Sequence, residues 1–196
     1  MFTLNPTPRK VDYIFYEGNF LKKDEISQVQ SQILSLEFME GRTGRSKEAD
    51  DFRRSKIKWI PGTKEWKWLY NKIIDKTFEV NKNHWDFDIS IAQDRIQYSQ
   101  YEGGDKGHYD WHIDVGPGVA SYRKLSIVIP LTPSNSYEGG DLEFVSQQPI
   151  SDQDYLTLNE VGSISIFPSF ILHKVNPVIT GMRNSLVMWV GGVPFR

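Results

Sequence analysis

A series of short apolar runs, each interrupted by turn-forming residues, fills the chain from Asn83 onward. Valine, isoleucine, leucine and aromatic residues dominate the runs, whereas glycine, proline and aspartate gather between them, as at residues 102–105, 117–118 and 138–141. Such runs are typical of β-strands joined by tight connections, and many in succession predict a β-sandwich or barrel. The expected strands are Phe87 to Ile91, Arg95 to Tyr101, Leu125 to Leu131, Asp141 to Val145, Ser163 to Phe167 and Asn184 to Val190.

Two segments before Asn83 have helical rather than strand periodicity. The first is expected from Asp24 to about Phe38, and the second follows Thr63, a plausible N-cap. A short strand over Tyr13 to Phe15 and another over Lys56 to Ile60 complete this half, after an irregular arm over residues 1–10. We expect one domain over residues 1–196, with a β core at about 86–192 and helical support at about 12–83 packed on one side. The expected buried face of the second helix is Glu65, Trp66, Leu69, Tyr70, Ile73, Ile74 and Phe78.

Composition removes several classes of function. The chain has no cysteine, so disulfides, thiolate metal sites and a cysteine nucleophile are excluded. The net charge is −2 and the sequence pI is about 6.1, which provides no overall attraction to nucleic acid or an anionic membrane. No apolar run approaches the ~18 residues that span a bilayer, and the N-terminal residues do not resemble a secretory signal. A cytoplasmic protein without a membrane partner is therefore expected, and no feature requires a dimer.

The stretch Tyr109 to Asp114 contains a histidine and an aspartate two positions apart. In a strand, His112 and Asp114 share a face, so they are candidate neighbouring ligands of a divalent metal. His173 follows an apolar run 61 residues later, which leaves room for antiparallel strands to bring it close. Two histidines and one carboxylate are the ligand set of non-haem Fe(II) sites with open positions. Each residue alone is also compatible with a structural or surface role, and His84 and His108 are expected to be structural or exposed.

A candidate anion pocket follows ten residues after His173. Arg183, Ser185 and Trp189 share one face of an expected strand. A guanidinium can bind a carboxylate through two hydrogen bonds, and the serine hydroxyl adds a third. An inward arginine in so apolar a strand would be costly without an anionic partner, whereas an edge-strand arginine facing water would need none.

These residues resemble the 2-oxoglutarate/Fe(II)-dependent dioxygenases, and most closely the prolyl-4-hydroxylase-like subgroup. The resemblance covers about half of the chain, and five blocks agree in order. They are residues 96–104, the His-x-Asp block at 109–114, the Gly-Gly-x-Leu turn at 138–142, the distal-histidine block at 167–178 and the run 183–189.

The resemblance implies a double-stranded β-helix (jelly-roll) whose open mouth holds the metal. It also implies Fe(II) as cofactor, 2-oxoglutarate and O₂ as co-substrates, and support of activity by ascorbate. Fe(II) would be held by His112, Asp114 and His173, and Arg183 would bind the distal carboxylate of 2-oxoglutarate. The remaining expected pocket residues are Tyr101, Tyr109, Ser185 and Trp189.

The implied reaction is hydroxylation of an unactivated C–H bond, with succinate and CO₂ as co-products. Subgroup resemblance favours a prolyl residue of a peptide or protein as the substrate. A nucleic-acid or small-molecule oxygenase, an inactive jelly-roll binding module and a zinc hydrolase are the alternatives. The run after Arg183 lacks the second arginine of nucleic-acid demethylases, which argues against nucleic acid. The polar stretch Gly41 to Lys56, with six basic and three acidic residues, is either a solvated loop or a substrate lid that clamps an acidic peptide.

Overall fold

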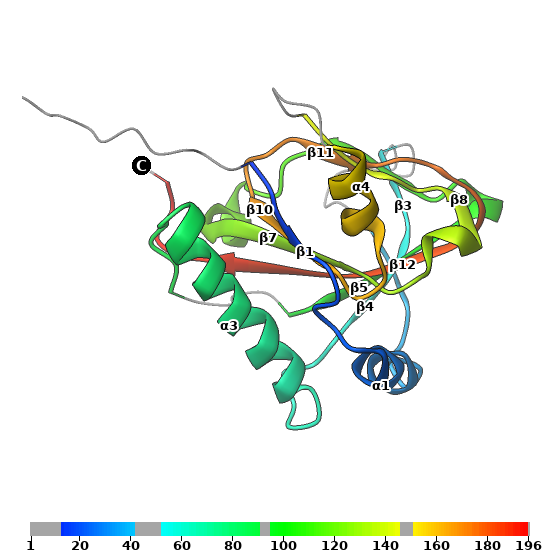
Figure 1. The fold of residues 1–196 in the computed structure, drawn as a ribbon, viewed down its shortest axis with the longest axis horizontal. Helices are drawn as coiled ribbons and strands as arrows, with labels where there is room; N and C mark the ends of the chain where they lie inside the picture. Colours follow the sequence, from blue (N-terminus) through cyan, green and yellow to red (C-terminus); the bar gives the residue numbers. More distant parts are fainter. Residues whose placement is uncertain (1–12, 42–51, 91–94, 146–150, 196) are drawn as a thin grey trace, which may run out of the picture.

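Two antiparallel sheets face each other in the computed structural model, which describes residues 13–41, 52–90, 95–145 and 151–195 (Figure 1). The larger sheet has the order β1 (Phe15–Glu17), β10 (Ile164–Pro168), β7 (Arg123–Pro130), β12 (Val178–Gly191), β5 (Gln97–Glu102), β4 (Lys56–Trp59) and β2 (Met39–Glu40), and β8 (Tyr137–Gly139) also pairs with β12. The smaller sheet has the order β3 (Arg53–Arg54), β6 (His108–His112), β11 (His173–Val175) and β9 (Leu142–Phe144). This arrangement confirms the predicted mainly β, jelly-roll fold.

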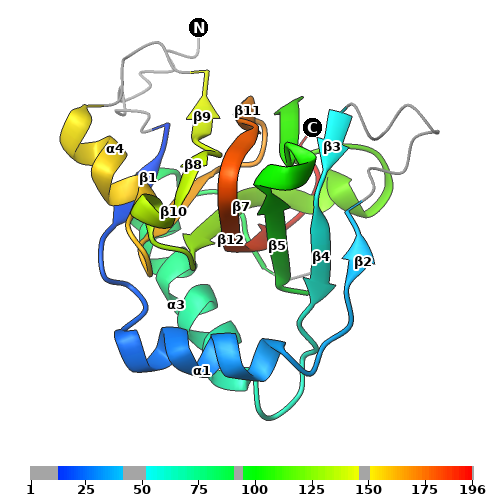
Figure 2. The same cartoon turned by 90° about the vertical axis from the view of Figure 1, so that its right-hand side faces the viewer.

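Helices α1 (Lys23–Ile33) and α3 (Lys67–His84) cover the outer face of the larger sheet, on the side away from β9 and β11 (Figure 2). Side chains of both helices pack in one buried cluster with alternate residues of β7 and β12. The predicted packing of the N-terminal helices on one sheet is therefore confirmed. The buried residues of the contact are Val29 and Ile33 of α1, Leu69, Ile73 and Val80 of α3, Leu125, Ile127 and Ile129 of β7, and Leu186, Met188 and Val190 of β12.

Helix α4 (Asp152–Asn159) was not expected from the sequence. It begins at Ser151, whose hydroxyl accepts a hydrogen bond of 3.2 Å from the backbone N–H of Asp154. Three short 3₁₀ turns also occur, η1 (Gly103–Asp105), η2 (Gly118–Tyr122) and η3 (Ser134–Ser136).

Both predicted helices differ from the observed ones at their ends. The first ends at Ile33 rather than near Phe38, because Met39 must pair with Ile57 of β4 and the intervening chain has to extend. The second begins at Lys67, after a turn over residues 63–66, and not at an N-cap at Thr63. Phe78 was wrongly placed on its buried face: the ring is 41% exposed, and Thr77 faces the core instead.

Residues 87–90 do not form the predicted strand. The side chain of Asn81 takes the place of a neighbouring strand, because its amide donates to the carbonyl of Phe87 at 2.8 Å and its oxygen accepts from the Phe87 N–H at 3.0 Å. Ile91, the last residue of the prediction, lies outside the described residues. The predicted arm over residues 1–10 and most of the polar loop over Gly41 to Lys56 also lie outside them.

Alternation along β5 and β12 sorts side chains between the two sides of the larger sheet. Leu186 and Met188 face the helices, whereas Arg183 and Ser185 point into the space between the sheets, opposite Tyr101 and Ser99 of β5. A second buried cluster fills part of this space, built from Tyr101, Val128, Leu142, Leu158, Phe167, Ile171, Val175 and Val178. None of the described helices combines the length and apolar character needed to cross a membrane.

Candidate metal and anion site

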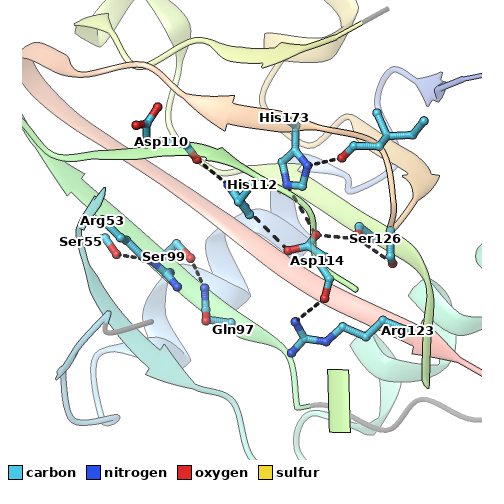
Figure 3. Close-up of polar contacts among 12 residues, drawn as sticks. Arg53, Ser55, Gln97, Ser99, Asp110, His112, Asp114, Arg123, Ser126 and His173 are labelled. Atoms are coloured by element: carbon cyan, nitrogen blue, oxygen red, sulfur yellow. Dashed lines mark hydrogen bonds and ion pairs between the residues drawn. The ribbon is translucent and has the colours of Figure 1, made fainter. Parts of the chain in front are cut away.

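The structure brings His112, Asp114 and His173 together at the ends of β6 and β11, the two central strands of the smaller sheet. His112 ends β6 and lies directly opposite His173, the first residue of β11. Asp114 follows β6, where its backbone N–H donates to the Ser169 carbonyl at 2.8 Å. One donor atom from each side chain can be chosen so that all three lie within 4.8 Å of one another. The Nε2 atoms of His112 and His173 are 3.7 and 3.5 Å from the two carboxylate oxygens of Asp114 (Figure 3).

Backbone carbonyl groups orient both imidazoles toward Asp114. Nδ1 of His112 lies 2.7 Å from the carbonyl oxygen of Asp110, and Nδ1 of His173 lies 2.8 Å from that of Ile171. A carbonyl oxygen only accepts, so Nδ1 carries a proton in both rings and Nε2 is the nitrogen that each neutral ring would offer to a metal. Two such nitrogens beside a carboxylate form a donor set that fits a divalent metal with open positions.

The carboxylate of Asp114 is held by a buried pair of hydroxyls. Ser126 of β7 donates to its Oδ2 at 2.6 Å, and the hydroxyl of Ser169 lies 2.9 Å from that of Ser126. Burial alone would raise the pKa of Asp114, but the neighbouring histidines, Ser126 and the indole of Trp189 outweigh it and lower the pKa. Trp189 Nε1 lies close enough to contribute without meeting the geometry of a hydrogen bond. The aspartate is therefore ionised and ready to bind a cation.

Burial disfavours the charged form of the neighbouring His112 as well, and here its effect on the pKa prevails. Desolvation, together with the nearby His173, lowers the pKa of His112 to about 4, although Asp114 acts to raise it. The ring of Tyr109 stacks on the ring of His112 with centroids 3.5 Å apart and an angle of 13° between the planes. Desolvation also raises the pKa of Tyr109 to about 12. At neutral pH the site thus contains a neutral imidazole, a neutral phenol and one carboxylate.

Arg183 lies in surroundings that suit the binding of an anion. It is only 3% exposed, its Nη1 lies 3.4 Å from the Ser185 hydroxyl, and its guanidinium lies 5.7 Å from the centre of the Tyr101 ring. Its Nε has no hydrogen-bond partner, and no carboxylate of the described residues forms an ion pair with it. Gly140 packs against it, since a Cβ there would lie 3.1 Å from Arg183 Cδ. A buried guanidinium without an internal counter-ion fits a bound carboxylate.

Two further residues of the predicted set, Tyr101 and Trp189, are buried. Tyr101 lies opposite Arg183, and both Tyr101 and Asp114 act electrostatically on Tyr109. Trp189 is 7% exposed and packs under the guanidinium of Arg123, 3.9 Å from its ring centre.

Two of the four histidines do not join the site. The His84 ring contacts Phe15 at 5.2 Å, and Nδ1 of His108 lies 2.9 Å from the carbonyl of Lys106. This agrees with their predicted structural or exposed character.

The sequence-based prediction of the site did not include several residues that lie near the triad. Ser126 and Ser169 had no sequence signal apart from being small polar residues in apolar runs, and Arg53 and Arg123 were two among many basic residues. Gln97, whose amide donates to Ser99 at 2.6 Å, also lies on this inner face. Only strand alternation relative to Tyr101 could have indicated Gln97 and Ser99.

Comparison with known sequences finds one family to which residues 96–191 are similar. The family model described as the 2OG-Fe(II) oxygenase superfamily matches residues 96–191. A PKHD-type hydroxylase of Synechococcus sp. (strain CC9311) is 38% identical over 95 residues, which cover 48% of this chain and 40% of that protein. Another, from Hyphomonas neptunium (strain ATCC 15444), is 28% identical over 181 residues, 88% of this chain and 75% of that protein. The similarity to the Synechococcus protein thus covers less than half of that protein's length.

Solved structures share the fold. A prolyl hydroxylase from Trichoplax adhaerens, in complex with a peptide of the hypoxia inducible factor oxygen degradation domain, superimposes with a TM-score of 0.70 at 21% identity, covering 91% of this chain and 83% of that one. A prolyl-4-hydroxylase from Pseudomonas putida has a TM-score of 0.67 at 19% identity, covering 91% and 92%.

Proposed function

We propose that this chain, whose residues 96–191 match the family model of the 2OG-Fe(II) oxygenase superfamily, is an oxygenase that uses Fe(II), O₂ and 2-oxoglutarate. The observation that carries the proposal is the pairing of two incomplete sites. Three metal donors converge on the smaller sheet, and a buried guanidinium, for which the described residues provide no counter-ion, points from β12 of the larger sheet into the space between the sheets. A ligand with a chelating keto acid at one end and a carboxylate at the other suits both.

Each group of residues has a distinct role in this proposal. His112, Asp114 and His173 hold the metal through Nε2 and carboxylate atoms whose orientation is already set. Bound Fe(II) would supply activation of O₂ for oxidation of 2-oxoglutarate and of the substrate C–H bond. Arg183 and Ser185 bind the distal carboxylate of 2-oxoglutarate. The aromatic walls, Tyr101, Tyr109 and Trp189, exclude water from the reacting end of the pocket.

The substrate proposed is a prolyl residue of a peptide or protein, with succinate and CO₂ as co-products. Support comes from the sequence resemblance to the prolyl-4-hydroxylase-like subgroup and from relatives described as PKHD-type hydroxylases. Ascorbate is expected to sustain turnover by keeping the metal in its reduced state.

The test is succinate formation by protein loaded with Fe(II) and supplied with 2-oxoglutarate and ascorbate, with and without proline-containing peptides. His112→Ala and Arg183→Ala should abolish the slow turnover that occurs without peptide. His108→Ala removes a histidine of the same strand that lies outside the triad, so it serves as the matched control and should retain that turnover. If the wild-type protein binds neither Fe(II) nor 2-oxoglutarate, the oxygenase proposal fails and a jelly-roll binding module is the better description.

A further inference from the structure

A second arginine, Arg53, contacts Tyr109, and Tyr109 in turn contacts His112 of the metal triad. Arg53 of β3 pairs with Tyr109 of β6, and its guanidinium lies 4.6 Å from the centre of the Tyr109 ring. Tyr109 also stacks on the imidazole of His112, with ring centroids 3.5 Å apart. The Tyr109 ring therefore contacts both the Arg53 guanidinium and a metal-binding histidine.

The side chain of Arg53 is held in place but not neutralised. Its Nε donates to the hydroxyl of Ser55 at 2.9 Å, and Ser55 is only 8% exposed. Gly41 packs against the pair, since a Cβ at that position would lie 3.2 Å from Arg53 Nε. Among the residues that the structure describes, no aspartate or glutamate forms an ion pair with Arg53, and the bond to Ser55 uses only its Nε.

The positive charge of Arg53 reaches the site. It acts electrostatically on both Tyr109 and His112, and Arg123 acts on Tyr109 as well. Arg123 lies over Trp189 and donates to the carbonyl of Asp114 at 3.3 Å. Figure 3 shows the two arginines extending from opposite sides toward the space beside the triad. Because Asp114 is a proposed metal ligand, the two arginines leave a net positive charge beside the triad. That charge favours binding of an anionic group of the substrate.

The adjacent residue, Arg54, has none of these features. It points to the other face of the strand, it is exposed, and its Nη1 donates to the carbonyl of Asp105 at 2.8 Å. The chain therefore carries two neighbouring arginines, one beside the site and one in solvent. This provides a built-in control for any role of Arg53.

We propose that Arg53 binds a side-chain carboxylate of the substrate, and that the substrate is an acidic peptide segment with aspartate or glutamate close to the target residue. This inference rests on the proposed oxygenase function. A guanidinium whose Nε is already bonded still offers its terminal N–H groups to a carboxylate, and such charge-assisted hydrogen bonds are about twice as strong as neutral ones. An extended peptide advances about 3.3 Å per residue, so a carboxylate one or two residues from the target falls within the reach of Arg53.

The first experiment uses wild-type protein and two fluorescein-labelled nonapeptides with a central proline. One peptide has aspartate on both sides of the proline, and the other has asparagine at those positions. Binding is measured by fluorescence anisotropy with Mn(II) in place of Fe(II) and with 2-oxoglutarate present. We expect the aspartate peptide to bind at least about tenfold more tightly, in line with ~1.5 kcal/mol for a hydrogen bond to a charged group. The preference should shrink as salt is raised.

The second experiment assigns the preference to a residue. Arg53→Gln should reduce the preference for aspartate over asparagine to less than about threefold, whereas Arg54→Gln should leave it, and turnover without peptide, at the wild-type level. Arg53→Glu should reverse the order of binding when a lysine peptide replaces the asparagine one. Circular dichroism of each variant checks that the fold is intact, and the wild-type comparison of the two peptides does not depend on that check.

The outcomes separate this inference from the function on which it rests. If wild-type protein forms succinate from 2-oxoglutarate but binds the two peptides equally or not at all, the acidic-peptide inference is overturned and the oxygenase proposal stands. Equal losses in Arg53→Gln and Arg54→Gln would also overturn it, because the effect would then be one of general charge. A protein that neither binds the metal nor forms succinate would defeat the proposed function itself.

Discussion

Ser126 donates a hydrogen bond of 2.6 Å to Oδ2 of Asp114 across the gap between the two sheets. Ser126 belongs to β7 of the larger sheet, whereas Asp114 follows β6 of the smaller one. The orientation of the Asp114 carboxylate therefore depends on the distance between the two sheets. Asp114 would therefore present its carboxylate to a bound metal in an orientation that Ser126 helps to fix.

Ser126→Ala should weaken metal binding by about 10- to 100-fold, the usual effect of losing the group that orients a ligand. Calorimetric titration of the metal-free protein with Mn(II) measures this directly, without any need for turnover. Ser165→Ala is the matched control, because Ser165 is equally buried but its hydroxyl has no hydrogen-bond partner. Equal affinity in the Ser126 variant and wild-type protein would show that Asp114 is positioned by other contacts.

The lowered pKa of His112 should make the metal-free protein less stable in mild acid. Its folded pKa of about 4 lies below the ordinary value of 6.5, so the unfolded chain binds more protons between these two values. The free energy of unfolding should therefore fall by about 2 kcal/mol from pH 7 to pH 5, measured by urea denaturation with a chelator present.

The control for this pH effect is chosen from the same strand. His112→Asn should remove most of the pH dependence between pH 7 and pH 5, whereas His108→Asn should retain it. Asp114 does not affect the comparison between pH 7 and pH 5. Its pKa is lowered from 3.8, so the stability that its ionised form contributes is lost only at pH values below 3.8. A slope that survives in His112→Asn would assign the effect to other groups.

Arg183→Met should separate stability from co-substrate binding. Because the guanidinium is buried with no internal counter-ion, replacing it with an apolar chain of similar length should raise the free energy of unfolding without ligand by about 1–3 kcal/mol. The same variant should lose the rise in melting temperature that Mn(II) plus 2-oxoglutarate produce in wild-type protein. A variant less stable than wild type, or one still stabilised by 2-oxoglutarate, would contradict this account of Arg183.

Gly140→Ala should displace the side chain of Arg183, against which Gly140 packs. Gly140 has a φ of +72°, and a Cβ there would approach Val178 Cγ2 to 2.9 Å and Arg183 Cδ to 3.1 Å. Backbone strain of about 1–3 kcal/mol and displacement of Arg183 should lower both stability and 2-oxoglutarate affinity. Gly104→Ala is the control, since no atom lies within 4 Å of its added Cβ. Thermal melts with and without 2-oxoglutarate distinguish the two, and equal effects would refute the specific role of Gly140.

Local patterns in the sequence determined most of the elements and the face on which each functional residue lies. Alternation along one strand was enough to put Arg183, Ser185 and Trp189 on the inner side, and helical spacing was enough to place Leu69 and Ile73 of α3 in the core. These patterns work because side-chain direction repeats every 2 or 3.6 residues and depends only on the local backbone. They failed at residues 87–90, where a single side chain, Asn81, replaced a strand partner.

Tertiary structure decided which of these residues meet. The sequence offered four histidines, and the register between β6 and β11 is what sets His173 opposite His112 and leaves His108 outside the triad. Ser126 and Arg53 join the site only because β7 faces β6 across the sandwich and β3 pairs beside it. Register and sheet spacing are set by burial of the whole core, a sum over residues far apart in the chain, so no local pattern records them.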